Sequence, residues 1–384
     1  MLNLLTLWEQ RKLGDLLTIE RGGSPRPIDA YLTTEENGLN WVKIGDAPEQ
    51  GRYITKTEEK IKPEGLSKTR SVVPGDLILS NSMSFGKPYI MSINGCIHDG
   101  WLLLRDTNNY FDLNFLCHLL SSDQLLSQYK SLAAGSTVNN LNKDLVSKVT
   151  INLPSIVEQK IIGNYLESLD NLIALHQRKC DQLGNIKKAL LEKMFPSQNE
   201  YTPRIRFKCF TDAWEQRKYE DIGICFSGGM LSYASLSDTG QYKCVLYGDL
   251  YTQYDTTIFK IDRRTNQKGN TIYKNDILFP QSTTVDAYSL ISPACLNEKI
   301  AETSGVFVIR PSKNIDGNFV AYYSKGNEKQ RNKLAKKAQG LTIVHLYYQS
   351  IKNETILIPS LIEQKKISSL LIKLDNLITL HQRE

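Results

Sequence analysis

One internal repeat constrains the fold of this chain more than any other feature of its sequence. Residues 8–12 (WEQRK) return as residues 214–218, and residues 154–160 (PSIVEQK) return as residues 359–365 (PSLIEQK). A period of roughly 200 residues is far longer than the repeats of a solenoid. The chain of 384 residues is therefore predicted to contain two copies of one unit, each a globular domain followed by a helix.

The closing motif of each copy predicts the start of a long helix. Ser155 with Glu158, and Ser360 with Glu363, have the spacing of a capping box, in which the serine accepts from a backbone N–H and the glutamate reaches back. Behind the first cap, seam residues alternate in steps of four and three, as in a coiled coil. These residues are Ile162, Leu166, Leu169, Ile173, His176, Cys180, Leu183, Lys187, Leu190 and Met194.

The second helix repeats the first. Residues 374–383 (LDNLITLHQR) match residues 169–178 (LDNLIALHQR), which makes Leu374, Ile378 and His381 seam residues. We interpret the two seam histidines as packing or register residues rather than as ligands. Glu384 aligns with Lys179, so the second helix is expected to be natively short or truncated.

Each globular part is predicted to be a mixed, strand-rich α+β domain. Short apolar runs between glycine, proline and asparagine indicate buried strands. They lie at residues 41–44, 76–80, 89–91, 101–104, 244–247, 276–279 and 306–309, and helical spacing covers residues 112–130 and 318–337. The predicted boundaries are 1–154 and 214–359 for the domains, 155–196 and 360–384 for the spacer helices, and 197–213 for a connector.

Composition favours a globular chain outside the membrane. Hydrophobic residues make up 41% and charged residues 23%, and the apolar runs fall far short of the roughly 20 residues of a membrane span. The N-terminus resembles no leader, so a cytoplasmic location is expected. Seven cysteines without a C-x-x-C pair indicate reduced thiols. The net charge of +6 favours a polyanionic partner.

Catalytic motifs are missing from the sequence. There is no phosphate-binding G-x-x-x-x-G-K-[ST] loop, no dinucleotide fingerprint and no metal-ligand spacing among the five histidines. Ser84-x-x-Lys87 resembles a serine–lysine pair, but its companion motifs are absent. Glu158-x-Lys160 and Glu363-x-Lys365 resemble part of a nuclease site, although capping already explains both glutamates. We expect a non-catalytic chain that binds no metal or cofactor itself.

Two domains on matched helices suit a long polymer with a regular repeat, and duplex DNA is the obvious candidate. The helices of the two copies agree, whereas the domains diverge. A protein that reads a palindrome would need equal domains. Divergent domains therefore predict two different half-sites separated by a spacer that is not read.

At the level of motifs, the whole chain resembles the DNA-specificity subunit of type I restriction-modification systems. The resemblance rests on the WEQRK entries, on the exits at residues 153–159 and 358–364, and on LDNLI at residues 169–173. It also rests on GDLILS at 75–80, FGK at 85–87 and GST at 135–137. A departure is Gly340-Leu341-Thr342, which stands where the first copy has Gly135-Ser136-Thr137.

The resemblance implies an internally repeated protein with two target-recognition domains and an antiparallel coiled-coil spacer. It implies an asymmetric bipartite duplex DNA target with adenine methylated in each half. The implied partners are two methylation subunits, which use S-adenosylmethionine, and, in complexes that restrict DNA, two restriction subunits, which use ATP and Mg²⁺. A stand-alone DNA-binding regulator and a coiled-coil scaffold with peptide-binding domains are the alternatives.

The candidate DNA-binding residues are polar or small residues in loops and cations on a helix, because phosphate contacts fix register and base-edge contacts give sequence. An ordinary turn or a solvated helix face is the alternative for each group, and for Tyr247 a place in the core. In the first domain they are Arg21, Gly22, Gly23, Ser24, Arg26, Asn81, Ser82, Ser84, Lys87, Ser136, Thr137 and Asn139. In the second they are Ser227, Gly228, Gly229, Tyr247, Gln281, Ser282, Thr283, Lys329, Arg331, Lys333 and Thr342.

Overall fold

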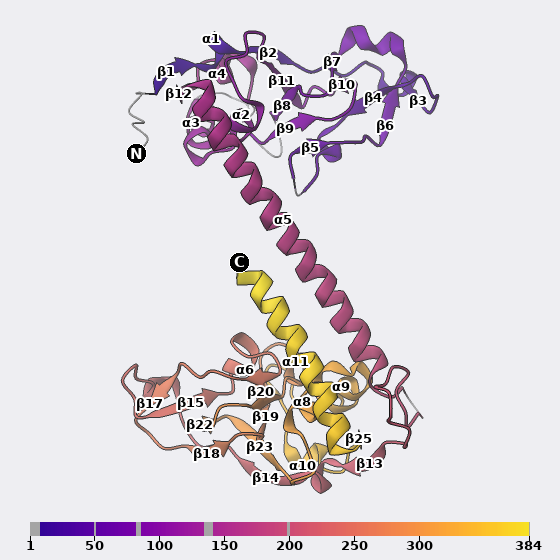
Figure 1. Ribbon diagram of the computed structural model, residues 1–384, viewed down its shortest axis with the longest axis vertical. Coiled ribbons are helices and arrows are strands. Elements are labelled where there is room, and N and C mark those ends of the chain that lie inside the picture. The colour runs from indigo at the N-terminus through magenta and orange to yellow at the C-terminus, as the bar shows by residue number, and fades with distance from the viewer. Residues whose placement is uncertain (1–7, 50, 82–85, 134–140, 198–199, 384) are drawn as a thin grey trace. The chain divides into compact units, whose positions relative to one another are not determined.

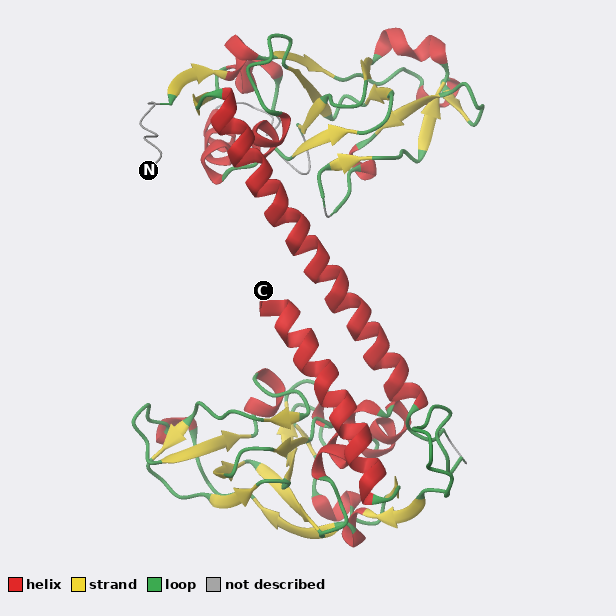
Figure 2. Cartoon of the chain, viewed as in Figure 1, coloured by secondary structure: helices red, strands yellow, loops and turns green. Residues whose placement is uncertain are grey.

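The computed structural model describes residues 8–49, 51–81, 86–133, 141–197 and 200–383. The chain divides into two compact units, Met1–His176 and Gln177–Glu384. In each unit most of the α-helices gather where the long helix joins, and most of the strands extend away from them (Figures 1 and 2).

The first unit contains two five-stranded sheets and a short strand pair. One sheet has the order β2 (Thr18–Arg21), β11 (Trp101–Arg105), β8 (Leu77–Ser80), β9 (Pro88–Met91), β5 (Tyr53–Ile54). The other has the order β3 (Leu32–Thr33), β6 (Glu59–Ile61), β4 (Leu39–Val42), β10 (Gly95–Ile97), β7 (Arg70–Val72), and β1 (Glu9–Lys12) pairs with β12 (Thr150–Leu153). The helices are α1 (Leu13–Leu16), α2 (Leu113–Leu120), α3 (Asp123–Ala133), α4 (Lys143–Ser147) and the start of α5 (Ile156–Lys193).

The second unit repeats this plan. Its five-stranded sheet has the order β14 (Gly223–Ser227), β23 (Val306–Pro311), β19 (Ile277–Pro280), β21 (Ala294–Leu296), β16 (Thr257–Ile258). A four-stranded sheet has the order β17 (Arg264–Thr265), β15 (Tyr242–Leu246), β22 (Ile300–Ser304), β18 (Asn270–Tyr273). Two further pairs are β13 (Glu215–Lys218) with β25 (Thr355–Ile358) and β20 (Ser282–Thr283) with β24 (Val344–His345). The helices are the end of α5, α6 (Asp249–Thr252), α7 (Ala287–Leu290), α8 (Gly317–Gly326), α9 (Glu328–Ala335), α10 (Tyr348–Ile351) and α11 (Leu361–Arg383).

The uninterrupted apolar runs of the sequence are central strands with both faces buried. In β8, Leu77 and Leu79 pack into the core beneath α2, α3 and α4, whereas Ile78 faces the other sheet. In β19, Ile277 and Phe279 likewise lie in one core, and Leu278 lies in the other. Successive residues of a strand point to opposite faces, so a strand between two cores has no polar face and reads as a continuous run. The predicted strands are confirmed within one to two residues at their ends.

The two predicted domain helices are each interrupted, which the sequence pattern did not show. The first divides into α2 and α3, where the Ser122 hydroxyl accepts from the Leu125 N–H at 3.4 Å. The second divides into α8 and α9, where Asn327 accepts from the Gln330 N–H at 3.0 Å. Polar caps end and restart a helix without breaking the apolar periodicity, and this is why the spacing alone predicted one helix.

The same polar contacts recur in both units and confirm the repeat at the level of atoms. Arg105 binds Asp76 with two donors, at 2.9 and 2.6 Å, and Arg310 binds Asp276 in the same way, at 3.0 and 2.7 Å. Gln159 accepts from the N–H of the residue that caps α2, at 3.0 Å. Its counterpart Gln364 does the same at the cap of α8, at 2.8 Å. The exit motif therefore fixes each long helix to its own domain.

Helix α5 spans 38 residues, or about 57 Å at about 1.5 Å per residue. Within the second unit its end packs antiparallel to α11. The Cys180 thiol lies 3.7 Å from the carbonyl of Ile378, and the Lys187 ammonium lies 2.5 Å from Asp375. Figure 1 shows the two helices side by side there.

The predicted seam is buried only in part. Cys180, Leu183 and Met194 are buried, whereas Leu169 and Ile173 expose 38% and 64% of their surface. Leu374 is buried, and Ile378, His176 and His381 are half-buried. The heptad spacing therefore predicted the helix itself along its whole length. Fully buried seam residues on α5 occur only from Cys180 onward.

All seven cysteines are free, as predicted, and five of them are buried. Burial raises the pKa of Cys96 to about 12 and that of Cys117 to about 11. Such thiols stay protonated at neutral pH and act as small apolar core residues.

Candidate nucleic-acid interface

In the first unit, four polar groups converge on the turn between β10 and β11. The Ser24 hydroxyl donates to the Asp99 carboxylate at 2.9 Å, and the His98 ring lies 3.0 Å from the same carboxylate. The backbone carbonyl of Asp99 accepts from Asn81 at 2.8 Å and from Arg21 at 3.3 Å. The loops after β2 and β8 thereby meet the β10–β11 turn in one cluster, which we call the Asp99 cluster.

The glycine pair of this loop has a reason within the fold. A Cβ atom on Gly22 would lie 2.2 Å from the carbonyl oxygen of His98, and one on Gly23 would lie 2.3 Å from that of Lys68. Their N–H groups donate to Trp101 and Ile97, at 2.9 and 3.1 Å. A side chain cannot occupy such a gap, so close packing between backbones accounts for both glycines without a ligand.

The second unit builds the same backbone frame around Gly305. The N–H of Gly228 donates to Val306 at 2.7 Å, and the N–H of Gly229 donates to Thr303 at 2.8 Å. The Gln281 N–H donates to the Gly305 carbonyl at 3.2 Å, as the Asn81 N–H does to Gly100 at 2.9 Å.

The side chains on this second frame differ from those on the first. The Ser304 hydroxyl lies between the backbones of Gly229 and Leu231, at 2.6 and 2.8 Å. Tyr247 covers Gly305, where a Cβ would lie 2.6 Å from the tyrosine ring, and Tyr247 remains 39% exposed. The two units therefore share the backbone hydrogen bonds of this frame and differ in the side chains around it.

The remaining loop residues fall into three groups. Arg26, Lys87, Ser227 and Thr342 are exposed. Asn81 and Thr283 are 3% and 8% exposed, and Thr283 pairs with Val344 in the two-stranded β20–β24 sheet, where Ser282 pairs with His345. Ser82, Ser84, Ser136, Thr137 and Asn139 lie outside the described residues.

Several cations of the predicted basic helix have acidic or aromatic partners within the fold. Lys333 and Lys337 lie 3.0 and 2.8 Å from the Glu354 carboxylate, and Lys325 lies 2.5 Å from Asp255. The Arg331 guanidinium stacks on Tyr288, 3.9 Å from the ring centroid, whereas Lys329 is exposed. Part of the positive charge of this helix is therefore balanced within the fold.

The predicted capping boxes form only in their first half. Ser155 accepts from the Glu158 N–H at 3.3 Å, and Ser360 accepts from the Glu363 N–H at 3.4 Å. The glutamates bind other partners. Glu158 accepts from the Trp8 indole at 3.2 Å, and Glu363 accepts from Arg206 at 2.7 and 2.8 Å. The predicted return of each glutamate to its cap was therefore wrong: Glu158 ties the exit of the first domain to its entry, and Glu363 ties the exit of the second to the connector before it.

The sequence interpretation missed His98, Asp99, Ser304 and Gly305. Their strands were predicted, but the turns before β11 and β23 carry no shared motif. Alignment of the two copies by their strands would have placed both turns at the same position. Among the described residues, no group of histidine, cysteine and acidic side chains is arranged to hold a metal ion. Within the same residues, every helix is too short or too polar to cross a bilayer.

Comparison with known proteins places the chain in a family. The model of the type I restriction modification DNA specificity domain matches residues 6–185 and 211–384. The chain belongs to this family. Specificity subunits of type I systems are not catalytic, which agrees with the expectation from the sequence.

Two relatives come from Methanocaldococcus jannaschii. The type I restriction enzyme MjaVIII specificity subunit is 23% identical, over 98% of this chain and 88% of its own length. The putative MjaX specificity subunit is 26% identical, over 98% and 89%. The crystal structure of the type I restriction-modification S subunit from M. genitalium has a TM-score of 0.57 at 14% identity, over 100% of this chain and 93% of that one. This likeness confirms the fold of two repeated mixed domains with long helices.

Proposed function

We propose that each unit of this specificity subunit reads one half of an asymmetric bipartite target in double-stranded DNA. The observation that carries the proposal is the pair of equal backbone frames with different polar side chains. Arg21, Ser24, His98 and Asp99 meet in one unit. In the other, the backbone N–H groups of Gln281 and Tyr247 donate to Gly305 and Ser304. Amide, guanidinium and carboxylate groups discriminate base edges in the major groove. The predicted loop residues that are exposed, such as Arg26 and Thr342, remain candidates for phosphate contacts.

The long helix supports a second part of the proposal, the docking of two methylation subunits in the cytoplasm. Val157, Ile161, Tyr165 and Leu172 follow one another at helical spacing on α5 and expose 66%, 65%, 65% and 49% of their surface. An apolar stripe of this kind marks a protein interface. The methylation subunits would bring S-adenosylmethionine, and restriction subunits, in complexes that contain them, would bring ATP and Mg²⁺.

The test is to co-express the full chain with its methylation subunits and to map methylated adenines by sequencing. We expect a motif of two unlike specific parts separated by unread bases. Arg21→Ala should change or weaken the reading of one part, and Tyr247→Ala the other. Lys160→Ala, which removes an exposed cation from α5, is the control. A symmetric motif, or variants that affect both parts alike, would contradict the proposal.

Two further measurements separate the alternatives. Tyr165→Glu should prevent co-purification of the methylation subunits and leave DNA binding unchanged, whereas a stand-alone regulator would have no such subunits to lose. DNA affinity should fall steeply between about 50 and 200 mM salt. A peptide-binding scaffold would show no such dependence.

A further inference from the structure

An aspartate at the same place in the repeated helix motif joins each long helix to its own domain. In the first unit this residue is Asp170 on α5, which pairs with Arg52, the residue just before β5. The His118 ring on α2 lies 3.8 Å from the same carboxylate. One turn earlier on α5, Glu167 accepts from Tyr53 at 3.0 Å. Burial, together with the Arg52 charge, lowers the pKa of His118, which disfavours a charged ring, and Arg52 is the cation paired with Asp170.

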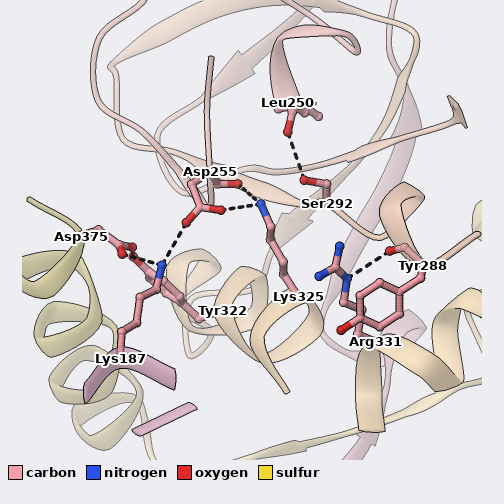
Figure 3. A network of polar contacts seen from close by, with 9 residues as sticks. All are labelled: Lys187, Leu250, Asp255, Tyr288, Ser292, Tyr322, Lys325, Arg331 and Asp375. Carbon is pink, nitrogen blue, oxygen red and sulfur yellow. Dashed lines mark hydrogen bonds and ion pairs between the residues drawn. The ribbon is translucent and has the colours of Figure 1, made fainter. Parts of the chain in front are cut away.

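In the second unit the equivalent residue is Asp375 on α11. Tyr322 on α8, which aligns with His118, donates to Asp375 at 2.5 Å. The Lys187 ammonium on α5 lies between two carboxylates, 2.5 Å from Asp375 and 3.0 Å from Asp255. Asp255, in the segment that leads into β16, also pairs with Lys325 on α8, at 2.5 Å. Figure 3 shows this alternation of acid and base from α11 through α5 to the domain loop.

The contacts at Asp170 and at Asp375, which we call the two joints, carry opposite charges on the domain side. The first domain presents Arg52 to its helix, whereas the second presents Asp255. Two carboxylates that face each other repel, so the second joint needs the Lys187 ammonium between them. Lys187 and Lys325 keep only 18% and 19% of their side chains exposed, although Asp255 keeps 55%. Lys325 and Lys187 outweigh the effect of partial burial and lower the pKa of Asp255 to about 2.

We infer that Lys187, Asp255 and Asp375 are positioning residues that fix the orientation of the second recognition domain on its helices. The inference rests on the proposed function, because orientation matters to a reader of two half-sites at a fixed spacing. Lys187 stands in the coiled-coil pattern, yet it binds loop and helix carboxylates at once. A network from three elements restrains rotation of the domain in a way that an apolar seam residue would not. Asp170 and Arg52 are the corresponding pair in the first unit.

The experiment compares Lys187→Met with Lys188→Met, which removes the neighbouring exposed cation of the same helix. The full complex methylates duplex oligonucleotides that carry the mapped target, with its unread spacer at natural length or one base pair longer or shorter. A misplacement of about 1 Å can cost about a hundredfold in rate. We expect Lys187→Met to reduce the preference for the natural spacer by about tenfold or more. Lys187→Arg and Lys188→Met should keep it.

A distance measurement reports orientation without DNA. Spin labels at residues 185 on α5 and 268 in the second unit, in a Cys209→Ser background, should give a broader distance distribution in Lys187→Met. Asp255→Asn removes one charge and keeps the Lys187–Asp375 pair, so it should act in the same direction even where Lys187→Met fails to fold. An unchanged spacer preference with an unchanged distance distribution would overturn the inference. Equal loss at every spacer length with an unchanged distribution would also overturn it. Wild-type complex that methylates no bipartite target would instead refute the proposed function, and the spin labels would still test the joint.

Discussion

Arg206→Met should destabilise the second unit more than any surface substitution. Arg206 lies in the predicted connector, where it donates twice to Glu363, at 2.7 and 2.8 Å, and once to the carbonyl of Asp212, at 2.7 Å. Glu363 is 1% exposed and stands in the first turn of α11. Methionine fills a similar volume without a charge, so the variant leaves a carboxylate buried without its cation.

The expected cost follows from this burial. Removal of one partner from a buried ion pair costs about 3–5 kcal/mol, because the remaining charge has lost its compensation. The first unit offers a matched control. Glu158 occupies the same motif position but accepts from the indole of Trp8, which is 45% exposed, at 3.2 Å. Glu158→Gln keeps an acceptor oxygen and should cost less than about 1 kcal/mol.

Urea unfolding followed by tryptophan fluorescence and circular dichroism provides the assay. The free energy of unfolding of each unit is taken from its own transition, since a single free energy is not defined for two domains. The double variant Arg206→Met with Glu363→Gln removes both charges and should recover about 2 kcal/mol of the loss. A loss below about 1 kcal/mol in Arg206→Met would refute the reasoning, because Glu363 would then be compensated by another group.

Two further predictions concern the Asp99 cluster and the Asp255 joint. Asn81 is 3% exposed and donates to the Asp99 carbonyl at 2.8 Å, so Asn81→Ala should lower the stability of the first unit by about 1–3 kcal/mol and relax the reading of one half-site only. Denaturant unfolding and methylation mapping measure these effects, and an unchanged motif with unchanged stability would contradict them. Because the pKa of Asp255 is lowered from 3.8 to about 2, its contribution to stability is present above about pH 4 and is lost as the pH falls toward 2. The unfolding midpoint of the second unit should fall through that window in wild type and fall less in Asp255→Asn, and identical pH profiles would exclude the role of this carboxylate.

Much of the fold could be predicted because its signals are local. The uninterrupted apolar runs around Leu77 and Ile277 predict strands with both faces buried, and both strands lie in the cores. The serine of each exit motif caps its helix, as its spacing predicts. The break between α2 and α3 could not be predicted in this way. It depends on the Ser122 hydroxyl, whose cap leaves the apolar spacing of residues 112–130 intact.

The candidate site was harder to predict because its contacts join distant parts of the chain. Asn81 belongs to a polar segment that suits a base-reading loop. Its side-chain amide nevertheless donates to the Asp99 carbonyl, and its backbone N–H donates to the Gly100 carbonyl. The sequence showed the amide and not its partner. Hydrogen bonds between backbones carry no signal in the side chains, so the frame that Gly22 and Gly228 share could be seen only in the structure.

Because the frame is made of backbone groups, the same fold can occur twice in one chain with different side chains at the equivalent turn. The frame around Gly305 repeats the hydrogen bonds around Gly100 through N–H and carbonyl groups, which every residue except proline can supply. The side chains at the turn are then free to differ, from His98 and Asp99 in one unit to Ser304 in the other, without a change in strand order. The shared backbone bonds keep the loop in place while the side chains around it change. The joint at Asp375 is the opposite case, because Lys187 and Asp255 depend on each other's charge and must change together.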